Sequence, residues 1–363
     1  MQHHPENDPQ YKGLAVNEGI PPPPTVNPYL RTRKKRRSFT STEYVEQILK
    51  GNITVLSQAV TLVESQKPEH QTIAQEVIEK CLPFSGRSVR IGITGVPGAG
   101  KSTSIDAFGM HLIHDRHKKL AVLAIDPSSE RSKGSILGDK TRMEELSCEK
   151  DAFIRPSPSA GSLGGVARKT RETIILCEAA GFDTVFVETV GVGQSETAVH
   201  SMVDFFLLIQ LAGTGDELQG IKRGIMEMAD GIIVNKADGN NVDKANLAAA
   251  QYRNALHLFP LPPSGWSPKV LTYSGYYKIG IQEIWDMVYE HINFTKDNGS
   301  FDLRRHSQAK YWMYESINEQ LRNHFYHSPE IIKMLEVKEK QVLNSEISSF
   351  MAAKEMLDLY FRK

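Results

Sequence analysis

The chain lacks any uninterrupted run of about 18 apolar residues, the length that a membrane-spanning helix requires. It has only three cysteines in 363 residues, an odd number at wide spacing, which argues against a disulfide framework and a cysteine-based zinc site. An excess of charge of one sign is also missing, because 43 basic side chains are matched by 43 acidic ones. We therefore expect no nucleic-acid or membrane partner and a reducing, cytoplasmic location, with the mitochondrial matrix as the alternative for a eukaryotic chain.

The first residues lack the charged-then-apolar layout of a secretory signal. Residues 1–39 are proline-rich and polar and then basic, a composition typical of a disordered tail. The basic cluster at 31–37 would suit an organelle transit peptide, but Glu6, Asp8 and the prolines at 21–24 do not suit an amphipathic presequence. We interpret the segment as a solvated tail.

Residues 40–86 have the pattern of a small helical region. Thr40 and Glu43 have the spacing of a capping box, in which each side chain satisfies a backbone amide of the other residue. Apolar positions then recur at helical spacing as far as Pro83.

From residue 87 to about 293 the pattern changes to short β-branched runs separated by helical stretches. Seven runs are predicted to be strands: Val89–Thr94, Leu120–Ile125, Phe153–Ile154, Val185–Val187, Phe205–Ile209, Ile232–Val234 and Val270–Tyr273. Such apolar runs suit strands covered on both faces. The alternation predicts an α/β fold with a mostly parallel, doubly wound sheet and ligands at the carboxyl ends of its strands.

After about residue 293 no further strand is predicted, and residues 294–363 form a helical appendage. Trp312, Ile317, Leu321 and Phe325 repeat at helical spacing. This apolar stripe serves either as core or as a subunit interface, because a helix must bury its apolar face.

The strand at 89–94 is followed by a match to G-x-x-x-x-G-K-[ST], the phosphate-binding P-loop. Its glycines permit a tight turn whose backbone amides face an oxyanion at a helix N-terminus. Lys101 is expected to reach the β- and γ-phosphates, and the Ser102 hydroxyl is expected to bind Mg²⁺. The nucleotide-binding residues predicted here are Gly95, Val96, Pro97, Gly98, Ala99, Gly100, Lys101, Ser102 and Thr103.

Asn235, Lys236 and Asp238 follow the strand at 232–234 and fit the N-K-x-D pattern by which GTPases select guanine. A carboxylate at Asp238 accepts hydrogen bonds from N1–H and the exocyclic amine of guanine, whereas adenine presents an acceptor at N1. Asn235 would tie this loop to the phosphate loop, and the stem of Lys236 would cover the base. A further loop after the last strand, Ser274, Gly275 and Tyr276, is where the backbone is expected to contact the guanine O6.

Three acids are candidates for the Mg²⁺ environment together with Ser102. Asp126 and Glu188 each end a predicted strand, and Asp139 lies on a loop between strands. Mg²⁺ prefers oxygen ligands and keeps several waters, so carboxylates near its waters suffice. The predicted catalytic set is Lys101, Glu188, Asp126 and Lys222.

The usual water-orienting glutamine is absent from its expected place. Ras-like GTPases carry it directly after the glycine of D-x-x-G, where this chain has Val192, and the nearest glutamine is Gln194. Slow intrinsic turnover that a partner or dimerisation stimulates is therefore expected. Lys222, beside a glycine-rich run, could supply a cation to the transition state.

These motifs, with further segments, resemble the MeaB / ArgK / methylmalonic aciduria type A family of P-loop GTPases. The segments that carry the resemblance are 95–103, 124–129, 134–143, 153–156, 187–196 and 216–222. Membership would imply a G-protein chaperone of adenosylcobalamin-dependent mutases such as methylmalonyl-CoA mutase. Such a chaperone gates cofactor loading, protects the mutase and forms homodimers through its C-terminal helices.

By motif match the resemblance assigns Ser102, Asp126, Asp139 and Glu188 to the Mg²⁺ environment. It assigns Asp238 and 274–276 to guanine, and it places Lys222 in a mobile switch. The segment at 273–276 departs from the commoner Ser-Ala-Leu of such proteins.

Two other functions share a P-loop. A metallochaperone GTPase for nickel enzymes usually displays histidine or cysteine clusters, which His3-His4 and three dispersed cysteines do not supply. A small-molecule kinase would have no use for a guanine-selecting loop at 235–238 and should bind an acceptor.

Overall fold

The computed structural model describes residues 39–125, 143–156, 163–189, 195–212 and 223–361. The contacts of the chain divide it into two units, Met1–Phe39 and Thr40–Lys363. All but one residue of the predicted tail therefore lies outside the described residues. In the described residues, no helix is both long enough and apolar enough to cross a bilayer.

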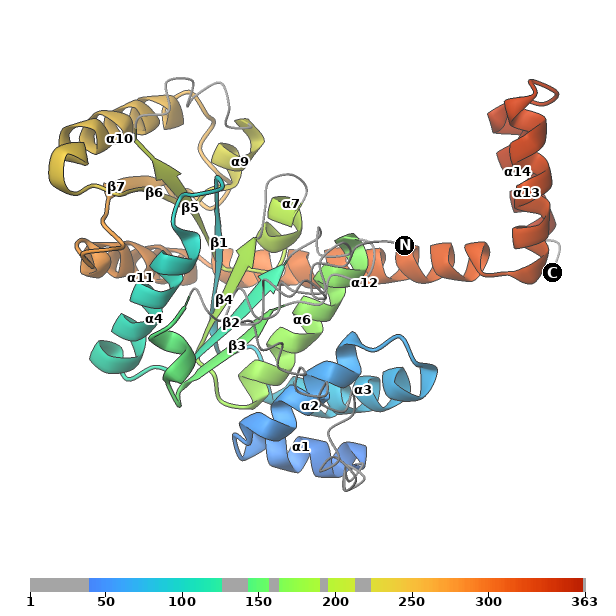
Figure 1. Ribbon diagram of the computed structural model, residues 1–363, viewed down its shortest axis with the longest axis horizontal. Helices are drawn as coiled ribbons and strands as arrows, with labels where there is room; N and C mark the ends of the chain where they lie inside the picture. The colour runs from blue at the N-terminus through green and yellow to red at the C-terminus, as the bar shows by residue number, and fades with distance from the viewer. Residues whose placement is uncertain (1–38, 126–142, 157–162, 190–194, 213–222, 362–363) are drawn as a thin grey trace, which may run out of the picture. The chain divides into compact units, whose positions relative to one another are not determined.

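The second unit contains a seven-stranded sheet in which every neighbouring pair is parallel (Figure 1). In chain order the strands are β1 (Val89–Gly95), β2 (Leu120–Ile125), β3 (Ala152–Pro156), β4 (Thr184–Thr189), β5 (Phe205–Leu211), β6 (Gly231–Asn235) and β7 (Lys269–Thr272). In space the order is β3-β2-β4-β1-β5-β6-β7. The sheet confirms the predicted parallel α/β fold, and each of the seven predicted runs corresponds to one strand.

The observed strands differ from the predicted runs by a few residues at most. The run predicted at 153–154 extends to five residues because Ala152 through Pro156 pair in register with β2. The apolar core of a strand is visible in the sequence, whereas its polar ends are defined by the partner strand.

Helices cover both faces of the sheet. They are α4 (Lys101–Arg116), α6 (Leu163–Ala179), α7 (Ser195–His200), α9 (Arg223–Met228), α10 (Val242–Leu256) and α11 (Ile281–Asp297). Alternate residues of one strand point to different clusters: Leu207 of β5 lies in the core with α4 and α11, and Leu208 lies in the core with α10. All positions of β2 and β4 are buried, as expected for strands that are covered on both faces.

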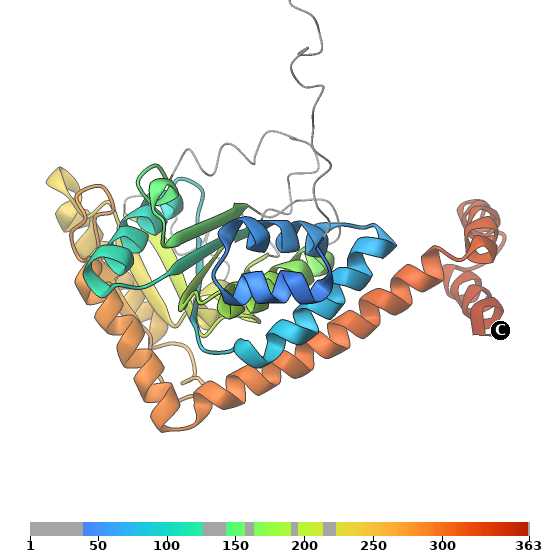
Figure 2. The ribbon, with the colours of Figure 1, turned by 90° about the horizontal axis from the view of Figure 1, so that it is seen from below.

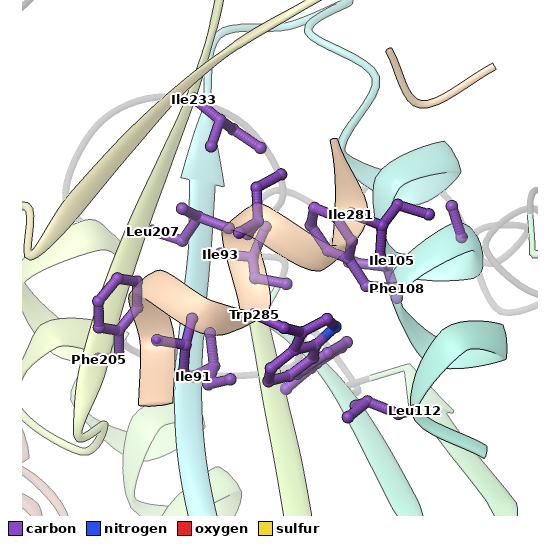
Figure 3. Packing of buried hydrophobic residues seen from close by; sticks show 14 of the residues in the cluster. Ile91, Ile93, Ile105, Phe108, Leu112, Phe205, Leu207, Ile233, Ile281 and Trp285 are labelled. Atoms are coloured by element: carbon purple, nitrogen blue, oxygen red, sulfur yellow. The ribbon is translucent and has the colours of Figure 1, made fainter. Parts of the chain in front are cut away.

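The larger core lies between the sheet, α4 and α11. Ile91 and Ile93 of β1 meet Phe108 of α4 and Trp285 of α11 there (Figure 3). The ring of Trp285 stacks on Phe186, with 6.2 Å between ring centroids. This packing holds α4, and with it the phosphate loop that precedes α4, against β1.

Three helices precede the sheet: α1 (Ser41–Leu49), α2 (Ile53–Glu64) and α3 (Pro68–Cys81). The predicted capping box is confirmed, because Glu43 N donates to Thr40 Oγ1 at 3.3 Å and Thr40 N donates to Glu43 Oε2 at 2.9 Å. Helices α2 and α3 pack against α6.

Three helices follow α11: α12 (Ser300–Tyr326), α13 (Pro329–Leu343) and α14 (Ser349–Phe361). Figure 2 shows α11 and α12 meeting at a sharp corner, where Gly299 has a φ of 78°. Helix α11 spans the boundary expected between residues 293 and 294. On α12 the apolar stripe is divided: Trp312 is buried and donates from Nε1 to the carbonyl of Ser201, whereas Ile317 and Leu321 are exposed.

Candidate nucleotide site

The phosphate loop joins β1 to α4 at the carboxyl edge of the sheet. Gly100 caps α4 in the left-handed region, with a φ of 83°, and a Cβ there would lie 2.6 Å from Asn235 Nδ2. A Cβ on Gly95 would lie 2.2 Å from the carbonyl oxygen of Ile209 on the neighbouring strand. Gly100 is therefore required both for its left-handed conformation and for space, whereas Gly95 is required for space.

Helix α4 has no side-chain cap at its N-terminus. The first amides of a helix have no partner within the helix, and the helix dipole places partial positive charge at that end. An oxyanion is the natural partner for these groups. The turn at 96–100 is open on this side, since Pro97 and Gly98 are exposed whereas Ala99 is buried beneath them.

Lys101 is the first residue of α4. Its ammonium group donates to the carbonyl oxygens of Gly95 at 2.8 Å and Val96 at 3.4 Å. Burial lowers the pKa of Lys101, and the carboxylates of Glu188 and Glu196 act in the opposite direction. The lysine is thus held over its own loop, next to two acids.

Ser102 and Glu188 are brought together although 86 residues separate them. The Ser102 hydroxyl donates to Glu188 Oε1 at 3.4 Å, and Glu188 is buried at the end of β4. Next to this pair, the Thr189 hydroxyl donates to Thr94 Oγ1 at 2.9 Å and ties β4 to β1. A hydroxyl and a carboxylate in contact form an oxygen donor set of the kind that Mg²⁺ prefers.

Asn235 connects the phosphate loop to the two loops expected to bind the base. Its side-chain Nδ2 donates to the carbonyl of Ala99 at 2.8 Å. Its Oδ1 accepts from the amides of Lys236 at 2.7 Å and Gly275 at 3.0 Å. The buried side chain of Asn235 therefore sets the spacing between the phosphate loop and the loops that are expected to bind the base.

Asp238 is held by Ser274. The Ser274 hydroxyl donates to Asp238 Oδ2 at 2.5 Å, and Ser274 itself is fully buried. Lys236 adopts a left-handed backbone conformation with a φ of 61°, and its carbonyl accepts from Asn241 Nδ2 at 2.7 Å. The carboxylate of Asp238 is thus oriented by its neighbours before any ligand arrives.

The three residues of the loop at 274–276 have different contacts. Ser274 orients Asp238, and the Gly275 amide donates to Asn235, so both residues support the site from within the protein. The Tyr276 side chain is 79% exposed and makes a T-shaped contact with Tyr277.

Five positions named from the sequence lie outside the described residues: Asp126, Asp139, Val192, Gln194 and Lys222.

Glu196 is a residue to which sequence reasoning assigned no role. It lies in the first turn of α7, is only 2% exposed, and its charge acts on Lys101. An acidic residue in the first turn of a helix is ordinary, so only the fold reveals that it is buried beside the phosphate loop.

The family model described as "Methylmalonyl Co-A mutase-associated GTPase MeaB" matches residues 56–330. A putative GTPase of Caulobacter vibrioides is 49% identical over 86% of this chain and 95% of its own length. The GTPase ArgK of Escherichia coli is 47% identical over 79% of this chain and 86% of its own length. The mitochondrial methylmalonic aciduria type A homolog of Mus musculus is 40% identical over 96% of this chain and 87% of its own length.

A solved structure described as "LAO/AO transport system kinase" superposes with a TM-score of 0.71. It is 37% identical in sequence, and the match covers 88% of this chain and 97% of that one. The family model covers well over half of the residues, and the relatives are similar along most of their own length. The chain therefore belongs to the MeaB family of P-loop GTPases.

Proposed function

We propose that this protein binds GTP with Mg²⁺, hydrolyses it to GDP and phosphate, and acts as a G-protein chaperone of an adenosylcobalamin-dependent acyl-CoA mutase of the methylmalonyl-CoA mutase type. The chaperone would gate cofactor loading and protect the mutase. The family supports the choice of client, since its description names methylmalonyl Co-A mutase.

The observation that carries the nucleotide part is the arrangement around Asn235. Its three hydrogen bonds hold the phosphate loop and the base-selecting loop to one another. These bonds bring the N-terminus of α4, which would bind the triphosphate, and the oriented carboxylate of Asp238 into one site. Guanine satisfies that carboxylate with two donors, whereas adenine would leave it facing an acceptor.

The phosphates would be bound by the amides of the turn at 96–100, by the N-terminus of α4 and by Lys101. Lys101 would exchange its two backbone carbonyls for phosphate oxygens. A phosphate oxygen carries negative charge and attracts the ammonium group more strongly than a carbonyl dipole does, so this exchange favours the bound state.

Ser102 and Glu188 are the described residues that would hold Mg²⁺, and we propose that Asp126 and Asp139 complete its environment. When bound, the ion would neutralise negative charge on the β- and γ-phosphates. Glu188 would act through the waters of the ion, because its carboxylate is already within 3.4 Å of the Ser102 hydroxyl.

Hydrolysis also requires an oriented water. We propose that no residue of the isolated chain performs this task well, since Val192 stands where Ras-like proteins have glutamine. Partner binding would then supply or position the missing group, and Lys222 would add a cation. Slow turnover alone and faster turnover with the partner follow from this arrangement.

The same proposal includes a homodimer formed through α12, α13 and α14. Their exposed apolar side chains support it, among them Leu343, Phe350 and Phe361. We further propose that the chain is organised as a tail at 1–39, N-terminal helices at 40–86, a GTPase domain at 87–293 and a helical appendage at 294–363. The three free cysteines are in accord with a reducing compartment such as the cytoplasm, which we also propose.

The decisive experiment measures phosphate release from GTP by the purified protein alone and with an adenosylcobalamin-dependent mutase. We expect slow turnover that rises at least about tenfold when the mutase is added, a threshold well below the roughly 10³–10⁵-fold that a supplied arginine contributes in other GTPases. Lys101→Ala with the same mutase is the control for contaminating GTPases. Rapid turnover of the isolated protein that no mutase alters would contradict the chaperone proposal.

A further inference from the structure

Tyr273 follows β7 and connects the two loops that are expected to bind guanine. Its amide donates to the carbonyl of Val234 at 2.9 Å, and its carbonyl accepts from the amide of Ala237 at 3.0 Å. These two bonds lie on either side of the first two residues of the base-selecting loop. The next residue along the chain is Ser274, whose hydroxyl orients Asp238. The backbone of Tyr273 therefore belongs to the frame that presents Asp238.

The side chain of Tyr273 extends from these loops to α4. It is buried, and its ring lies against that of Phe108, with 5.1 Å between ring centroids. Burial raises the pKa of Tyr273, and the neighbouring hydroxyl of Ser104 opposes this shift. Ser104 is also buried and lies two residues after Ser102, in the first part of α4. One aromatic side chain thus spans from the base loops to the helix that follows the phosphate loop.

Gly275 lies against the same phenol. A Cβ on Gly275 would be 3.1 Å from Tyr273 Oη, 3.3 Å from Cε1 and 3.4 Å from Cζ. The two distances to carbon are below the optimum of about 3.5–4.0 Å for contacts between carbon atoms. The amide of Gly275 donates to Asn235 Oδ1 at 3.0 Å, so a movement away from the phenol would lengthen that bond. Gly275 has no left-handed φ, and glycine is therefore required for space.

This close fit accounts for a departure in the sequence, since the commoner Ser-Ala-Leu of such loops has alanine where this chain has Gly275. We propose that Tyr273 is a positioning residue for guanine: its phenol sets the distance between α4 and the loop at 274–276, and it requires Gly275 beside it. The inference rests on the proposed GTP binding and deepens it, because the same phenol then contributes to the preference for guanine over adenine.

The effect belongs to base recognition and not to phosphate binding. GTP is expected to use the phosphate loop together with the loops that carry Asp238 and Gly275. ATP carries the same phosphates, but its base offers no pair of donors to Asp238. A shift of the loop at 274–276 therefore weakens GTP and leaves ATP unchanged, whereas a general loss of stability weakens both.

The first test is Gly275→Ala, whose methyl group must displace the loop or the phenol by a few tenths of an ångström. GTP should bind about fivefold more weakly, the equivalent of about 1 kcal/mol, at the lower end of the cost of overpacking. The affinity for ATP should not change. Competition of both nucleotides against a fluorescent guanine nucleotide measures the ratio. Gly164→Ala is the matched control, because Gly164 is exposed in α6 and a Cβ there meets no described atom within 4 Å.

The second test determines whether Tyr273 and Gly275 act together. Tyr273→Leu removes Cε1, Cζ and Oη, so it should lower the ratio of GTP to ATP affinity, and Gly275→Ala should have no further effect in that background. Tyr273→Phe keeps the ring and should retain most of the parent's ratio. Tyr252→Leu removes another buried ring, in the core with α10, and controls for lost stability. Its ratio should equal that of the parent.

A Gly275→Ala variant that binds GTP as the parent does, or that loses GTP and ATP affinity by the same factor, would overturn the inference. Equal effects of Gly275→Ala in the parent and in Tyr273→Leu would also overturn it, because independent residues give additive changes. If Tyr273→Leu does not fold, Tyr273→Phe replaces it as the background, where the nearest atom is gone and the effect should shrink. A parent that does not prefer GTP to ATP would contradict the proposed function as well, whereas a normal Gly275→Ala variant of a GTP-selective parent contradicts this inference alone.

Discussion

At the scale of single residues, the candidate site depends on side chains that hold other parts of the protein in place. Asn235 bonds to three loops, and Ser274 bonds to Asp238. A mutation in such a residue alters geometry, whereas a mutation in Lys101 or Asp238 alters the contact with the ligand itself. The two kinds of substitution should therefore have different effects on nucleotide affinity and specificity.

Asp238→Asn should change base preference. The amide replaces one acceptor by a donor, so GTP should lose a charge-assisted contact worth roughly 2–4 kcal/mol. Xanthosine triphosphate carries a carbonyl where guanine has its amine and should bind the variant better than GTP does. Competition of GTP, XTP and ATP against a fluorescent nucleotide measures the change.

The exposed residue Asp243, near the start of α10, provides the control Asp243→Asn, which should retain the preference for GTP. A preference for GTP that survives in Asp238→Asn would exclude Asp238 as the selector.

Lys101→Ala should abolish binding of the triphosphate and leave the fold intact. Its ammonium group donates to two carbonyls of its own loop, so the loss of these hydrogen bonds costs little stability. Isothermal titration with GTP should show no binding, while the melting temperature should stay within a few degrees of that of the parent. Lys119→Ala, which removes an exposed lysine before β2, should bind GTP normally. Normal GTP affinity in Lys101→Ala would refute the phosphate-loop assignment.

At the scale of elements, α7 ends in a histidine whose surroundings make the stability of the protein depend on pH. His200 ends α7 and makes a T-shaped contact with Phe206, at 5.6 Å between ring centroids. Burial and, to a lesser extent, the positive charge of Arg304 on α12 lower the pKa of His200 to about 4, against the opposing charge of Asp230. The neutral imidazole is therefore the form that the folded protein stabilises.

His200→Gln should make unfolding less dependent on pH. Between pH 6.5 and about 4 the unfolded chain protonates His200 and the folded protein does not, so the free energy of unfolding falls as pH falls. This one site contributes a slope of up to about 1.4 kcal/mol per pH unit in that window, and none below it. Urea unfolding at several pH values should show the parent losing this stability and His200→Gln losing less.

Substitution of the exposed His257 by Gln controls for the loss of a surface histidine. Equal slopes for the parent and His200→Gln would contradict the assigned environment.

At the scale of the whole molecule, the C-terminal helices expose more apolar surface than a single chain needs. Leu343 is 83% exposed and Phe350 is 86% exposed, and an apolar groove between α13 and α14 is lined by Val342, Met356 and Leu357. Apolar surface of this extent is typical of an interface, which is consistent with the proposed homodimer.

Leu343→Glu should convert the proposed dimer to a monomer without changing nucleotide affinity. A buried, unpaired carboxylate at an interface costs several kcal/mol, whereas an exposed one costs nothing. Leu258→Glu is the matched control, because Leu258 is 80% exposed and follows α10, outside the three C-terminal helices. Sedimentation velocity should find Leu258→Glu and the parent as dimers. A monomeric parent, or a Leu343→Glu variant that stays dimeric, would rule out this interface.

The sequence alone determined the strand-forming runs, the phosphate loop and the capping box of α1, because each depends on residues that are neighbours along the chain. Periodicity identifies a buried strand, and glycines before a lysine and a serine define a phosphate turn whatever the rest of the protein does. The sequence predicted that Asn235 would tie its loop to the phosphate loop. Only the fold shows that its partner is the carbonyl of Ala99, 136 residues away. The burial of Glu196, whose charge acts on Lys101, was decided by tertiary structure alone. Contacts at such separation arise from how helices pack on the sheet, and no local pattern distinguishes this side chain from others on a solvated helix face.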